Sequence, residues 1–193
     1  KIRPNIGEIP SVKEYKAYPT NLNNLFAGDD FKKRNKFNGD ISNWNVSNVT
    51  NMKSMFLFSE FNNNISNWDV SNVTDMYHMF DSGQFNNNIS NWNVGNVKYM
   101  NEMFSGSEFN KDISNWNVRN VENMDSMFLK SIFNQNISSW EVSKVEDMEN
   151  MFFYNSNFDQ DISNWDISNV TEMSSMFKGS KLSKGNAENI IKS

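Results

Sequence analysis

One block of sequence, Phe37–Glu60, constrains the fold more than any other feature, because it recurs almost unchanged along the chain. New copies begin at Phe61, Phe85, Phe109, Phe133 and Phe158. A fixed period of this length is typical of arrays in which each repeat is too small to fold alone and buries its apolar face against its neighbours. The sequence therefore predicts a single elongated domain built from stacked repeats.

We divide the 193 residues into a cap, six repeats and an end segment. Residues 1–36 contain all three prolines and a degraded half-repeat, in which we expect Val12–Ala17 to form a strand and Thr20–Phe26 a short helix. The six repeats span residues 37–60, 61–84, 85–108, 109–132, 133–157 and 158–181. Residues 182–193 are either a C-terminal cap or the start of a continuation that has been cut.

Two apolar periods occur inside each repeat. Trp44, Asn45 and Val46 alternate as a short strand requires. Val49 and the segment Met52–Phe56 then place apolar side chains at spacings of three, three and one, which is one face of about two helical turns. The predicted fold is an α/β repeat, a solenoid with one short parallel strand and one short helix per repeat.

The positions that are constant in every repeat are expected to form the core, since they must be buried in each copy. In the first repeat they are Phe37, Ile41, Trp44, Val49, Met52, Met55 and Phe56, and the later tryptophans are Trp68, Trp92, Trp116, Trp140 and Trp165. All six Trp and all twelve Met of the chain occupy such positions, which favours packing over a methionine-rich ligand groove. Polar rows that begin at Asn38, Ser42 and Asn48 are expected to hydrogen-bond the backbone of the neighbouring repeat.

The pattern F-N-x-x-I-S-x-W-x-V-S-x-V-x-x-M-x-x-M-F, which runs from Phe37 to Phe177, resembles the repeat of BspA-like leucine-rich-repeat surface proteins. It is most similar to the branch found in mycoplasma surface lipoproteins. The spacing of Ile41, Trp44 and Val46 corresponds to the strand signature of that family. The resemblance implies a right-handed solenoid, display at the bacterial cell surface, roles in adhesion or host-protein binding, and no catalytic residues.

The residues themselves offer little chemistry. The chain has no cysteine, its net charge of −5 argues against a nucleic-acid partner, and His78 is the only histidine. We expect His78 to lie exposed on a helix, and we predict no enzyme activity, no cofactor and no metal site. One row of turn residues is compatible with a calcium site, but we expect it to have a structural role: Asp40, Asn64, Asn88, Asp112, Asn136 and Asp161.

A ligand would have to contact the variable positions of the repeat. On a leucine-rich-repeat solenoid, the residue between the inward Trp and Val faces the concave side, which is the usual binding surface. Here that row consists of Asn45, Asp69, Asn93, Asn117, Glu141 and Asp166, with Arg119 beside it. The same row is also compatible with a solvated surface that binds nothing. Tyr77, Tyr99 and His78 on the helix face are a second candidate surface.

We expect a non-enzymatic binding or adhesion module at the cell surface, which presents an extended face to an extracellular host protein or glycan. The alternative is a structural or antigenic spacer with no specific ligand. No stretch approaches the roughly 20 apolar residues of a membrane span, so anchoring is expected to use a lipid- or wall-attached segment not present in this sequence. Self-association through an open edge is a further expectation.

Overall fold

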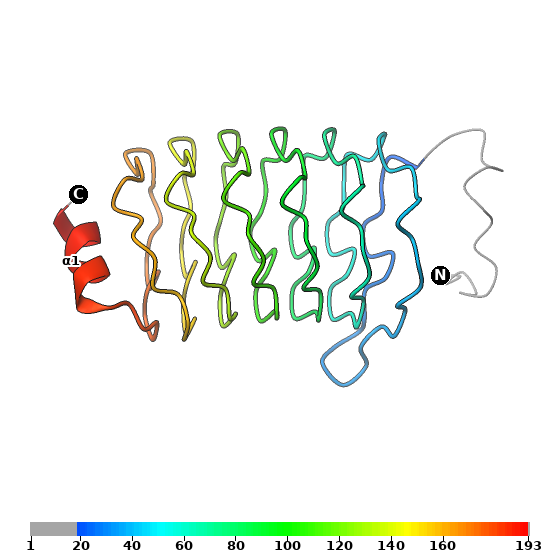
Figure 1. Ribbon diagram of the computed structural model, residues 1–193, viewed down its shortest axis with the longest axis horizontal. Helices are drawn as coiled ribbons and strands as arrows, with labels where there is room; N and C mark the ends of the chain where they lie inside the picture. The colour runs from blue at the N-terminus through cyan, green and yellow to red at the C-terminus, as the bar shows by residue number, and fades with distance from the viewer. Residues whose placement is uncertain (1–18, 193) are drawn as a thin grey trace.

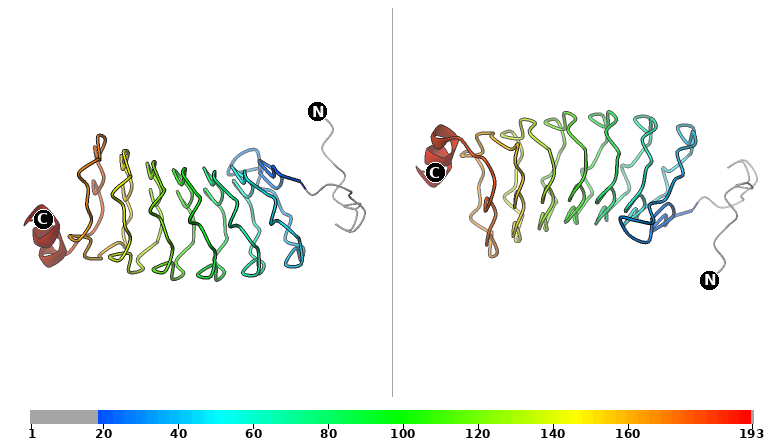
Figure 2. Two further views of the ribbon diagram at one scale, coloured as in Figure 1. Left: turned by 90° about the horizontal axis from the view of Figure 1, so that it is seen from above. Right: turned by 90° about the horizontal axis from the view of Figure 1, so that it is seen from below.

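The computed structural model describes residues 19–192 as a row of coils stacked side by side (Figure 1). The coils remain adjacent in two perpendicular views, and α1, Lys184–Lys192, lies beyond the last of them (Figure 2). Among the described residues α1 is the one helix, and parallel pairing between coils is limited to isolated bridges such as Asn51 with Asp75. The predicted α/β leucine-rich-repeat-like solenoid, with a strand and a helix in each repeat, is therefore wrong.

The predicted helix is absent because the backbone of that segment bonds mainly to the next coil. In Met76–Gly83, the amides of Met76, His78 and Phe80 donate to carbonyls one repeat further on, at 2.9–3.1 Å. The intervening amides close tight local turns, for example from Met79 to the Met76 carbonyl at 3.1 Å. His78 and Ser82 both have a φ of 54°, in the left-handed region, which a right-handed helix excludes.

The same pair of left-handed residues recurs, four positions apart, in all six repeats. The pairs are Ser54 and Phe58, His78 and Ser82, Glu102 and Gly106, Ser126 and Lys130, Asn150 and Tyr154, and Ser175 and Gly179. A helix of two turns is marginal by itself, since nucleation costs more than so few hydrogen bonds return. Bonds between coils therefore decide the local conformation.

The predicted strand is absent because turns close on both sides of it. The amide of Trp44 donates to the Ile41 carbonyl at 3.1 Å, and the amide of Val49 donates to the Val46 carbonyl at 2.8 Å. The backbone between these turns is too short to form a ladder with the next coil. Apolar alternation from Trp44 to Val46 thus reflects burial of the two side chains and not an extended sheet.

The N-terminal half-repeat continues the bonding pattern of the full repeats. Leu22, Asn24 and Phe26 donate their amides to carbonyls of the first full repeat at 2.9–3.0 Å, so the expected helix at Thr20–Phe26 is also wrong. The expected strand at Val12–Ala17 lies outside the described residues.

The core is a set of side-chain rows that run along the stack. Phe56 and Phe80, one repeat apart, stack with ring centroids 5.5 Å apart, and the same contact continues to Phe177 at 5.6–5.8 Å. Phe37 and Trp44 are partly buried at the start of the stack. The remaining residues expected in the core are at most 7% exposed: Ile41, Val49, Met52, Met55, Phe56, Trp68, Trp92, Trp116, Trp140 and Trp165.

Polar ladders hold neighbouring coils in register. Each indole from Trp68 onward donates its Nε1–H to an Ile carbonyl of the preceding repeat at 3.0–3.1 Å, as Trp92 does to Ile65. Two of the three predicted polar rows are confirmed. The row from Asn38 accepts backbone amides of the next repeat, and the row from Asn48 donates to backbone carbonyls of the preceding one. The row from Ser42 instead uses its amides within its own repeat.

Candidate functional site: a polar groove across four repeats

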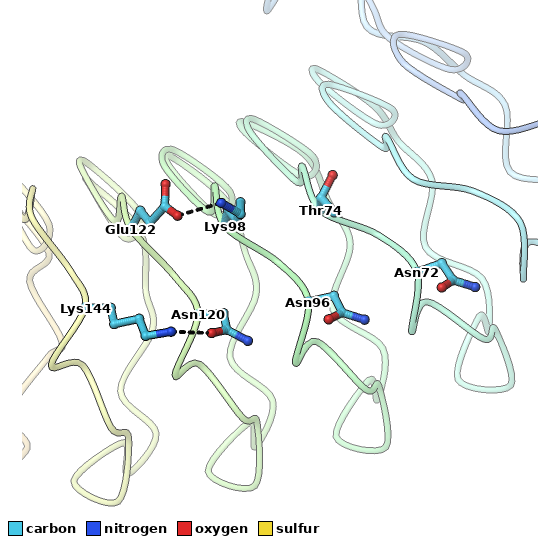
Figure 3. Close-up of a pocket in the computed structure, with 7 residues that line it drawn as sticks. All are labelled: Asn72, Thr74, Asn96, Lys98, Asn120, Glu122 and Lys144. Atoms are coloured by element: carbon cyan, nitrogen blue, oxygen red, sulfur yellow. Dashed lines mark hydrogen bonds and ion pairs between the residues drawn. The ribbon is translucent and has the colours of Figure 1, made fainter.

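An open groove of about 470 Å³ crosses the second to fifth repeats on one side of the stack (Figure 3). We call it the polar groove, and every side chain that lines it can form hydrogen bonds. The lining residues are Asn72, Thr74, Asn96, Lys98, Asn120, Glu122 and Lys144. They come from two parallel rows, three and five positions after the row that was expected to face a concave sheet.

The stacked coils fix the positions of these groups. Asn72 and Asn96 donate their Nδ2–H groups to carbonyls of the preceding repeat at 2.7–2.8 Å, which orients each amide along the groove. Lys144 replaces asparagine in the fifth repeat, and its Nζ donates to the Oδ1 of Asn120 at 2.8 Å (Figure 3). Within the groove, a regular row of amides is therefore followed by a cation.

An ion pair borders the amide row. The Nζ of Lys98 lies 2.8 Å from the Oε1 of Glu122, and both side chains are substantially exposed (Figure 3). The hydrogen bond from the ammonium group to Glu122 raises the pKa of Lys98, with a further contribution from the opposite charge. The groove thus offers amide, hydroxyl, ammonium and carboxylate groups at fixed spacing to a ligand that lies along the stack.

The row expected on the concave face is exposed, but it does not lie on a sheet. Five of its members accept a hydrogen bond from the amide two residues later, namely Asn45, Asp69, Asn93, Asn117 and Asp166. These bonds cap local turns. The hydroxyl of Ser71, followed by its amide, lowers the pKa of the Asp69 carboxyl. These side chains thus have a structural partner within their own turn. The groove side chains also have partners, but they bond between repeats and line a common open space.

The sixth member of the row, Glu141, forms an ion pair with Arg119. Both residues border a smaller hollow of about 190 Å³ beside Trp116 and Ser139. The structure therefore brings three of the predicted ligand residues together, Asn117, Arg119 and Glu141, and distributes the others along the stack as turn caps.

His78 is not exposed on a helix, as the sequence suggested. Its side chain is 18% exposed and lies between two carboxylates: Nδ1 is 2.8 Å from Oδ2 of Asp81, and Nε2 is 3.3 Å from Oε1 of Glu102. One ligand atom from each of the three residues lies within 4.8 Å of the others, which is close enough to hold a cation. With its two ring nitrogens facing carboxylates of different repeats, His78 also links the second and third repeats.

Burial is the main influence on the acids around His78. It raises the pKa of Glu102, an effect that His78 partly offsets and that Asp81 and Asp125 reinforce. Burial likewise raises the pKa of Asp125. The Tyr77 hydroxyl lies 3.5 Å from Oε1 of Glu102. This cluster therefore concentrates acidic groups in a half-buried position.

The row considered for calcium caps turns. Asp40 and its equivalents in the other repeats each accept the amide of the serine two residues later at 2.9–3.0 Å. The same bond is the main cause of the lowered pKa of Asp40, Asp112 and Asp161. One oxygen of each side chain is thus engaged in the turn, which gives the row a structural role.

The groove residues were not identified as a site from the sequence. Asn72 and Asn96 belong to a nearly constant row, which suggested a purely structural ladder. A signal was nevertheless present: Lys144 interrupts that row, and the row two positions later changes from threonine to lysine and glutamate. These substitutions place variable charged side chains beside a constant row, and this combination could have identified the groove from the sequence.

In residues 19–192 no helix has the length and apolar character needed to cross a bilayer. The fold and the groove define a stacked-coil repeat protein with a polar surface groove. Residues 20–132 and 107–190 match the model of a family described as "Mycoplasma protein of unknown function, DUF285", and the chain belongs to this family. Searches of curated proteins and of solved structures each gave no match.

Proposed function

We propose that the chain is a non-enzymatic binding module that acts in adhesion at the cell surface and takes an extended extracellular ligand, a host glycan or protein segment, in the polar groove. The observation that carries the proposal is the groove itself, because it spans four repeats and is lined only by hydrogen-bonding side chains. Preorganised polar groups lose little freedom on binding, which favours recognition of a flexible polar ligand.

Membership of the Mycoplasma family and the resemblance of the repeat to BspA-like surface proteins support display at the cell surface. The groove carries both signs of charge, with Lys98 and Lys144 near Glu122. Such a mixture suits ligands rich in hydroxyl and amide groups better than a polyanion, and the net charge of −5 also disfavours nucleic acid.

The competing function is a surface spacer with no specific ligand. It is favoured by one observation: the amides of Asn72 and Asn96 are already used in bonds between repeats, so the row has a structural role without any ligand. The binding module requires the exposed groove side chains for ligand affinity, whereas the spacer requires them only for stability.

The test compares the binding of a triple variant and a double variant to panels of glycans and of immobilised extracellular-matrix and serum proteins. Replacement of Lys98, Glu122 and Lys144 by alanine removes the groove charges, and we expect at least about a tenfold loss of affinity for any ligand found. Replacement of Arg119 and Glu141 by alanine is the control, since it removes a more exposed ion pair that lies outside the groove.

Thermal unfolding of both variants should remain close to that of the parent chain, because exposed ion pairs contribute little to stability. Unchanged binding by the groove variant, with loss of binding in the Arg119 and Glu141 variant, would place the ligand on the other row. Absence of binding to every probe would favour the spacer.

A further inference from the structure

The bonds between coils have a fixed direction. Along the turn segment, every second amide of one coil donates to the next coil, as from Met148 to the Glu172 carbonyl at 2.8 Å and from Asn150 to the Ser174 carbonyl at 3.0 Å. A second bond runs the opposite way, from the Thr171 amide to the Glu146 carbonyl at 2.8 Å. Each coil therefore presents a different pattern of donors and acceptors on its two sides.

In the last coil, the backbone groups that would bond to a following coil have no partner among the described residues. The amides of Met173, Ser175 and Phe177 occupy the donor positions, and the carbonyl of Thr171 occupies the acceptor position. None of the four groups bonds to another described residue. We call this surface, residues 166–179, the C-terminal end face.

In the first coil, the backbone groups that would bond to a preceding coil are open in the same way. The carbonyls of Asn21, Asn23 and Leu25 stand where the next coil accepts amides through Asn51, Lys53 and Met55. The amide of Thr20 stands where the next coil donates through Thr50. Within residues 19–192 these four groups also have no partner. We call this surface, residues 20–27, the N-terminal end face.

Apolar side chains are exposed on both end faces. Ile167 is 44% exposed and Met173 37%, whereas the equivalent Val142 and Met148 of the preceding coil are at most 1% exposed. On the opposite face Leu25 is 39% exposed, whereas the equivalent Met55 is fully buried. The side chains that coils normally bury against each other are thus available at the two ends of the stack.

Helix α1 covers one part of the C-terminal end of the stack and leaves the turn segment of the last coil open. Asn186 and Asn189 donate to Asp159 and Asp161, and Ile190 packs against the core. Residues 171–175 all remain exposed. At the other end, the loop at residues 28–36 projects from the side of the stack and not along its axis (Figure 1).

We propose that a second copy of this chain docks end to end, so that the amides of Met173, Ser175 and Phe177 donate to the carbonyls of Asn21, Asn23 and Leu25 in the next copy. The Thr20 amide and the Thr171 carbonyl form the reverse bond. Met173 and Ile167 are covered by the first coil of the next copy. Because the two surfaces differ, the contact is heterologous and leaves each dimer with two free ends, so that it continues into a filament.

The test uses three variants of the whole chain. Ile167→Lys with Met173→Lys blocks the C-terminal end face, and Leu25→Lys blocks the N-terminal end face, because a buried charge opposes pairing of edges. Ile132→Lys is the matched control, since Ile132 is 42% exposed in a turn along the middle of the stack. Circular dichroism verifies that each variant folds.

Sedimentation equilibrium over a range of concentrations and negative-stain microscopy measure the assembly. We expect the parent chain and Ile132→Lys to form oligomers beyond the dimer, and each end-blocked variant to associate at least about tenfold more weakly. An equal mixture of the two end-blocked variants should form a dimer and nothing larger, since only one compatible pair of faces remains.

Three results would overturn the proposal. One is a parent chain that stays monomeric at every concentration. Another is an Ile132→Lys variant that is as impaired as the end-blocked chains. The third is an end-blocked variant that dimerises alone, because this would show an interface between identical surfaces.

Discussion

In this chain, the burial and the contacts of a side chain depend more on residues one repeat away than on its neighbours in sequence. His78 illustrates this dependence. Its sequence context suggested a solvent-exposed helical position, yet it is mostly buried, because Glu102 of the next repeat and Asp81 of its own turn both contact the imidazole. The sequence predicted which position would vary, but not that the side chains of adjacent repeats would meet there. That depends on the left-handed φ values of His78 and Glu102.

Replacement of Glu102 by glutamine tests the electrostatics of this cluster. Burial raises the pKa of Glu102 above its unfolded value, and the facing Asp81 and Asp125 add to the increase, while His78 opposes it. The folded state therefore binds the proton more tightly, and stability from this group falls as the pH rises from the unfolded pKa through the folded pKa. We expect Glu102→Gln to be more stable than the parent at neutral pH, with the difference vanishing at about pH 4, near the unfolded pKa.

Urea denaturation at both pH values measures this effect. Glu108→Gln is the control, because it removes the same charge from an exposed position. A Glu102→Gln variant that is less stable than the parent at neutral pH would show that pairing with His78 outweighs the cost of burying the carboxylate.

At the scale of local elements, one apolar pattern was compatible with two backbone conformations. Met52, Met55 and Phe56 lie on one side of the chain in a helix, and they also lie on one side in the observed turns. The residues that point inward follow from the pattern, since constant positions such as Val49 and Met52 are fully buried. The backbone conformation does not follow from it, because amides that would close a helix donate to the next coil instead.

The indole ladder is an element whose contribution can be measured. Trp140→Phe removes the Nε1–H donor and leaves the buried Ile113 carbonyl without this partner, which it accepts at 3.1 Å. The carbonyl still accepts the Trp116 amide at 3.1 Å, so loss of the indole bond costs about 0.5–1.5 kcal/mol, in addition to the smaller ring volume. In a chain of this size each kcal/mol lowers the melting temperature by roughly 2–4 °C.

Trp44→Phe is the matched control, since the Trp44 indole is partly buried and donates to no described residue. Thermal unfolding followed by circular dichroism should give a clearly larger decrease for Trp140→Phe than for Trp44→Phe. Equal decreases would mean that ring volume alone accounts for the constant tryptophan.

At the scale of the whole molecule, the repeated register makes the number of coils adjustable in principle. The apolar rows and the ladders connect equivalent positions, so any two full repeats present nearly the same surfaces to each other. The polar groove does not share this property, because its charged members Lys98, Glu122 and Lys144 come from three different repeats. The repeated sequence predicted the stacking of units, but the groove depends on differences between units that only the stacked arrangement brings together.

Deletion of residues 85–108 therefore separates the scaffold from the groove. The deletion places Phe109 against Phe61 and the Trp116 indole against the Ile65 carbonyl, which are the same contacts that Phe85 and Trp92 make now. We expect a folded chain that unfolds cooperatively with lower stability, since each repeat contributes its own energy and that of one interface. X-ray scattering should show a particle shorter by one coil spacing, about the 5.5–5.8 Å that separates stacked phenylalanine rings.

Deletion of residues 85–96 is the control, because half a repeat shifts every apolar row out of register and should abolish cooperative unfolding. If both deletions were equally damaging, the repeats would not be interchangeable, and stability would depend on contacts specific to each pair of neighbours.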